Sequence, residues 1–136
     1  MKIHVKFSFL QEISVENVNQ LDLLPEYEEE NENQYENVYH YENEQQEQRL
    51  KFRNVTTKGF KLKKAQLSAN ESNIDYVIID EASAFNVTNS KIKTLNVEIL
   101  KDATIADSAI GKIEKLRVAG NFSIANCYID EIPSHG

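Results

Sequence analysis

Three histidines and one cysteine are the side chains of this chain best suited to acid–base, nucleophilic or metal chemistry. His4 lies in an alternating stretch, His40 among tyrosines and glutamates, and His135 close to the C-terminus. A catalytic or metal site needs several such groups to converge, and this spacing gives no sign of convergence. Cys127 has no histidine near it in sequence, which favours a buried or corner cysteine over a nucleophile. We therefore predict no catalytic residue, no metal site, no cofactor and no enzymatic activity.

Tyrosines interleaved with glutamates are a second chemically distinctive feature. Residues 26–48 hold nine Glu and no Lys or Arg. Acidic groups with aromatic anchors between them can dock on the basic surface of a partner protein. The residues that we predict to bind such a partner are Tyr27, Glu28, Glu29, Glu30, Tyr35, Glu36, Tyr39, Tyr41 and Glu42. The alternative is a solvated charged segment, which we favour for residues 26–34.

A basic stretch follows directly. Residues 49–64 hold seven Lys or Arg and no acid, so we expect glutamates from 26–48 to neutralise part of it. In residues 49–53 apolar and basic side chains alternate, which predicts a strand in residues 49–55. Tyr35, Tyr39 and Tyr41 could form an opposing strand across a turn near residues 43–48.

The elements that would position these groups are indicated by apolar residues that recur every 17 to 21 positions from Phe60 to Ile129. They fall into three series. The first series is Phe60/Leu62, Val77/Ile79, Leu95/Val97 and Leu116/Val118; the second is Ala65/Leu67, Phe85/Val87, Ala103/Ile105 and Phe122/Ile124; the third is Ile74, Ile92, Ile110 and Ile129. Within each step of the first two series, apolar residues are two apart, which is the period of a strand and not of a helix.

Three short strands that return to register after about 18 residues predict a parallel triangular β-helix of about four rungs. We predict two parts, an N-terminal cap element in residues 1–54 and the β-helix in residues 55–136. Residues 1–24 would cover the first rung, with either a strand or a short helix from Ser14 to Leu24. The alternative is that a partner chain covers their apolar face. Val97 should stack between Ile79 and Val118, and Pro133 is placed to stop further pairing.

Composition narrows the class of protein. The chain has 136 residues, a net charge of −7 and 40% hydrophobic residues, which suits one mainly β domain with a single core. A single cysteine and the lack of a visible signal peptide or membrane span favour a cytoplasmic protein that contacts no membrane. The acidity disfavours direct binding of nucleic acid.

The segment LNVEILKDATIADSAIGKIEKLRVAGNFSIANCYIDEI, residues 95–132, resembles the bactofilins. The shared features are the L-x-V and A-T-I steps and the I-x-x-L-x-V that opens the next rung. Bactofilins are bacterial cytoskeletal proteins with a right-handed triangular β-helix that polymerise end to end without nucleotide. The resemblance implies a non-enzymatic scaffold and a homo-oligomer. The competing hypothesis is an acidic inhibitor, immunity protein or nucleic-acid mimic that binds a basic protein through residues 26–48.

Overall fold

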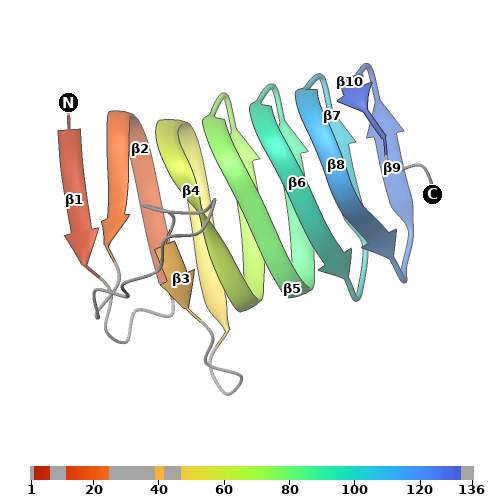
Figure 1. Ribbon diagram of the computed structural model, residues 1–136, viewed down its shortest axis with the longest axis horizontal. Coiled ribbons are helices and arrows are strands. Elements are labelled where there is room, and N and C mark those ends of the chain that lie inside the picture. The colour runs from red at the N-terminus through yellow and green to blue at the C-terminus, as the bar shows by residue number, and fades with distance from the viewer. Residues whose placement is uncertain (1, 7–11, 25–38, 42–46, 133–136) are drawn as a thin grey trace.

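The computed structural model describes residues 2–6, 12–24, 39–41 and 47–132, and the described chain winds as a parallel coil of strands (Figure 1). The strands are β1 (Lys2–Lys6), β2 (Glu12–Leu24), β3 (Tyr39–Tyr41), β4 (Gln48–Asn70), β5 (Asn73–Thr88), β6 (Lys91–Ile99), β7 (Ala103–Ala106), β8 (Ala109–Val118), β9 (Phe122–Ala125) and β10 (Tyr128–Glu131). All of them pair in parallel, in one sheet. The predicted parallel β-helix is therefore confirmed, with about five turns.

The isoleucine column of the sequence pattern is confirmed by the strand register. Ile74 pairs with Ile92, Ile92 with Ile110, and Ile110 with Ile129. The first three side chains are at most 2% exposed. Stacked, fully buried β-branched side chains contribute on the order of 1.5–3 kcal/mol each, so this column is a principal part of the core.

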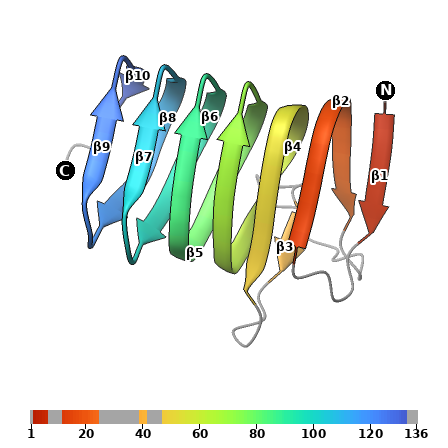
Figure 2. The same ribbon diagram turned by 180° about the vertical axis from the view of Figure 1, so that it is seen from behind.

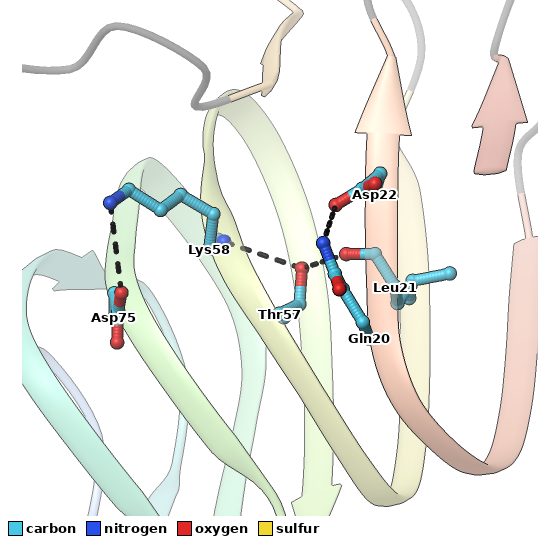
Figure 3. A network of polar contacts seen from close by, with 7 residues as sticks. Gln20, Leu21, Asp22, Thr57, Lys58 and Asp75 are labelled. Atoms are coloured by element: carbon cyan, nitrogen blue, oxygen red, sulfur yellow. Dashed lines mark hydrogen bonds and ion pairs between the residues drawn. The ribbon is translucent and has the colours of Figure 1, made fainter. Parts of the chain in front are cut away.

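Thr57 occupies the place of an isoleucine one turn earlier, between Leu21 and Ile74 (Figure 3). Its buried hydroxyl donates to the Leu21 carbonyl oxygen at 2.7 Å and accepts from the Gly59 N–H at 3.4 Å. The register between β2 and β4 shifts beside this point: Val18 pairs with Val55 and Leu21 with Thr57, so β2 has one more residue than β4 between the two pairs. The threonine hydroxyl thus gives a backbone carbonyl a hydrogen-bond partner at an irregular site.

The register predicted for Val97 is confirmed on the side of Ile79 and wrong on the side of Val118. Val97 stacks between Ile79 and Leu116, whereas Val118 lies beside Ile99. The cause is one extra residue in β8, where Leu95 and Asn96 face residues 113 and 115.

An extra residue in β5, at position 83, shifts the second series in the same way. Leu67, and not Ala65, pairs with Phe85, and Ala69 pairs with Val87. The Phe85 and Val87 columns then continue through β7 and β9 as predicted. Figure 2, the view from behind, shows β7 and β9 on the side of the coil that faces the viewer.

The N-terminal segment is built from strands. β2 pairs with residues 49–57 of β4, and β1 pairs with residues 20–24, so the sheet runs without a break on both sides of residue 54. Residues 49–55 form a strand, as predicted. β3 was expected to oppose that strand across a turn, but it pairs in parallel with Phe60–Leu62 instead.

A recurring corner links the turns. The residues before it all adopt the left-handed conformation, with φ between 50° and 57°: Asn17, Asn54, Glu71, Asn89, Asp107 and Asn126. Immediately after the corner, Ser72, Ser90 and Ser108 are buried. Each serine hydroxyl donates to the carbonyl two residues earlier, at 2.8–2.9 Å, and accepts an N–H from the preceding turn at 3.1 Å. This chain of hydrogen bonds fixes which residues of adjacent turns lie opposite each other.

Candidate interaction surface at the C-terminal end of the coil

The residues predicted to bind a basic partner lie mostly outside the described residues. Tyr27, Glu28, Glu29, Glu30, Tyr35, Glu36 and Glu42 belong to that part of the chain, as does Pro133. Tyr39 and Tyr41 lie in β3, which places their backbone beside β4. The acidic-binder hypothesis therefore stays a prediction.

Within the described residues, carboxylates of the next turn neutralise three lysines of the basic stretch. Lys58 lies 3.9 Å from Asp75, Lys63 lies 3.3 Å from Asp80, and Lys64 lies 3.8 Å from Glu81. Figure 3 shows the first of these pairs on the outside of the coil.

Glu47 is the described member of residues 26–48 that contributes to this neutralisation. Its carboxylate lies 3.8 Å from Arg49 and accepts hydrogen bonds from Gln66 at 2.8 Å and Ser83 at 2.6 Å. The expected neutralisation by residues 26–48 thus has one described example.

Within residues 2–6, 12–24, 39–41 and 47–132, no group of three His, Cys, Asp or Glu side chains is placed to hold a metal ion. Cys127 is half-buried at the last corner, where its Sγ contacts the carbonyls of Ala125 at 3.3 Å and Ile105 at 3.4 Å. It occupies the position that serine holds in the three earlier turns. No helix able to cross a membrane is found in the part of the chain that the structure describes.

The last turn of the coil exposes residues that occupy core positions. Phe122 stacks on Ala103 and Ile124 stacks on Ile105, yet their side chains are 40% and 45% exposed. Their equivalents one and two turns earlier are at most 2% exposed, because the following turn covers them. We name this end surface, residues 113–118 of β8 with β9 and β10, the terminal edge.

Local contacts hold the terminal edge in place. The Asn121 N–H donates to the Asp102 carboxylate at 2.8 Å, and the Asn121 carbonyl accepts from the Ala103 N–H at 2.9 Å. At the next corner the Tyr128 N–H donates to the Ser108 carbonyl at 3.0 Å. β9 and β10 therefore continue the register of the coil up to its end.

The terminal edge combines exposed apolar side chains with open hydrogen-bonding positions. In the described chain, β9 pairs with β7 and β10 pairs with β8, each on one side. An open strand edge of this kind is a ready template for another strand. Sequence reasoning predicted an open end but did not identify Phe122 and Ile124, although both were assigned to an inward series.

Comparison with known proteins identifies no relative: no family model, no curated protein and no solved structure matches this chain.

Proposed function

We propose that this protein is a non-enzymatic structural or scaffolding β-helix that acts by self-association through the terminal edge. The observation that carries the proposal is the exposure of Phe122 and Ile124 at positions that β4, β5 and β7 bury in the three turns before. Exposed apolar area on an unpaired edge gains both burial and backbone hydrogen bonds when another strand docks. The resemblance of residues 95–132 to the bactofilins also supports assembly.

Sedimentation velocity over a wide range of protein concentration tests this proposal. The protein should form dimers or larger species that persist at high salt, because apolar burial and backbone pairing are little screened. A protein that stays monomeric at every concentration would overturn the proposal.

Two aspartate substitutions separate assembly from folding. Ile124→Asp places a charge on the exposed terminal edge, so the coil should stay folded and become monomeric. Ile110→Asp is the matched control, because Ile110 is 1% exposed and a buried unpaired carboxylate costs several kcal/mol. We expect Ile110→Asp to unfold the coil. An Ile124→Asp variant that associates like the parent protein would show that the terminal edge is not the contact.

A further inference from the structure

We infer that the terminal edge binds the terminal edge of a second copy, giving a closed dimer whose two-fold axis passes through β9. This inference rests on the proposed function and adds to it the partner, the geometry and the number of copies. Three observations carry the inference: the two ends of the coil differ in exposed apolar residues, the last turn rises along the coil axis, and the charges of the terminal edge are unevenly distributed.

The two ends of the described coil differ in what they expose. Among the described side chains near the N-terminal end, Ile13 is 7% exposed, Val18 2% and Leu21 0%, and Ile3 and Val15 are partly buried. At the other end, Phe122 and Ile124 are 40% and 45% exposed. Head-to-tail stacking would set the exposed residues of the terminal edge against described apolar side chains that are already buried or partly buried. Contact between two terminal edges buries the exposed residues of both copies.

The direction of the strands suits this contact. All strands of one coil run in the same sense around its axis, since every pair is parallel. Turning a second copy over to face the first reverses that sense. The strands of two facing terminal edges therefore meet antiparallel, which is a favourable pairing geometry.

The rise of the coil selects one two-fold axis. A parallel coil advances by one strand spacing per turn, about 4.8 Å. Over the last turn, residues 113–118 are therefore the most recessed segment, β9 is intermediate and β10 protrudes most.

An axis through β9 sets β9 against its own copy and β10 against residues 113–118 of the other copy. The protruding β10 of each copy then meets the recessed residues 113–118 of the other. All three pairs of facing segments are therefore the same distance apart along the coil axis. An axis through β10 would bring the two protruding segments together and leave the other pairs about 4.8 Å further apart.

The charges along the terminal edge agree with the same axis. β10 carries Asp130 and Glu131, and β9 carries no charge. Residues 113–118 carry Lys115 and Arg117 with one acid, Glu114. An axis through β9 therefore sets an acidic strand against a net basic one, twice, and a neutral strand against itself. Opposed charges of this kind fix the register and the choice of partner.

The inward side chains restrict the register further. Ile129 faces the core and must meet an inward residue of the other copy, either Leu116 or Val118. Opposite Val118, it places Asp130 against Arg117. Opposite Leu116, it would place Glu131 against Glu114, which are like charges, and Asp130 against Lys115, whose Nζ already lies 3.5 Å from the Glu98 carboxylate. We therefore expect the contact between Asp130 and Arg117.

Charge reversal tests this contact. Arg117→Glu and Asp130→Arg should each associate with themselves roughly tenfold more weakly, because each homodimer then holds two like-charge contacts. A mixture of the two variants should recover dimers, since both contacts in the mixed pair join opposite charges. Lys51→Glu, an exposed change on β4, is the matched control and should behave as the parent protein.

Cysteine cross-linking tests the axis itself in a Cys127→Ser background. Facing β9 strands must keep Phe122 and Ile124 inward, so the outward Ser123 lies opposite Ser123 or Ala125 of the other copy. Ser123→Cys should form a covalent dimer alone or when mixed with Ala125→Cys, whereas Ser68→Cys, on the outside of β4, should not.

The outcomes separate the inference from the proposed function. Absence of any association by the parent protein overturns both. Growth beyond a dimer, failure of the charge-reversed pair to recover dimers, or association without cross-links through β9 overturns the inference and leaves self-association standing.

Discussion

Ser90 illustrates how one buried hydroxyl joins two turns of the coil. Its oxygen accepts the N–H of Ser72 at 3.1 Å, and its proton is donated to the Thr88 carbonyl at 2.8 Å. Asn89, just before it, takes a left-handed conformation that asparagine tolerates better than most residues. The corner therefore depends on two adjacent residue types, one for the backbone and one for the hydrogen bonds.

Ser90→Ala should destabilise the coil by about 1–3 kcal/mol, because the buried N–H of Ser72 loses its acceptor. Ser123→Ala is the control: this serine is exposed, and its change should cost under about 0.5 kcal/mol. Urea denaturation of both variants measures the difference. Equal stabilities would mean that the serine chain does not hold the turns.

At the scale of single residues, the sequence predicts the isoleucine column and also contains a signal for the corner. The isoleucine column was predicted correctly from its spacing of 18, 18 and 19 residues. Each of these isoleucines also follows a corner pair by two residues, as in Asn89-Ser90 and Asp107-Ser108. This repeated pair was a readable signal of the corner. The exposure of Phe122 was not readable, because it depends on what lies above the last turn and not on the residue itself.

Gly59 shapes a whole element, because it lets β4 pass close beside β5. Its φ is +115°, and a Cβ atom there would lie 2.0 Å from the Tyr76 carbonyl oxygen. Both the conformation and the space are therefore restricted to glycine.

Gly59→Ala should lower the melting temperature markedly, by more than Gly111→Ala does. At Gly111 a Cβ would lie 2.7 Å from the Lys93 carbonyl oxygen, a smaller overlap without the positive φ. Thermal unfolding followed by circular dichroism compares the two variants. A smaller effect at Gly59 would contradict this account of the crossing.

Strand existence was predictable, but strand register was not fully so. The alternation of inward residues is a local pattern, whereas an inserted residue such as Glu114 leaves that pattern intact on either side. The stacking of Val97 on Leu116 therefore could not be derived from spacing alone. The parallel pairing of β3 with β4 was not predicted for a related reason. The sequence between the two strands does not determine whether β3 pairs with residues 49–53 or with Phe60–Leu62.

Across the whole molecule, each turn packs against its neighbours only, as in other solenoids. Removing residues 90–107 would join Asn89 directly to Ser108 and preserve the corner. Ile74 would then stack on Ile110, and Phe122 would cover Phe85.

We expect this deletion of one full turn to fold with reduced stability and a β-type circular dichroism spectrum. Removing residues 90–98, half a turn, is the control: it places polar residues in inward positions and should prevent cooperative folding. Cooperative unfolding of the half-turn deletion would contradict the stacked-turn account.

The spacing of paired residues also sets the order in which the coil can form during synthesis. From β4 onward, partners in adjacent turns are 17 to 19 residues apart, whereas Glu12 waits for Arg49, 37 residues later. A ribosome delivers the N-terminal strands first. Residues 20–24 of β2 can pair with β1 at once, but residues 12–18 must stay without their β4 partners until β4 arrives. The chain can then add one turn for every 17 to 19 residues made. Nascent chains arrested after β5, β6 and β8 should gain protease resistance in steps of one turn.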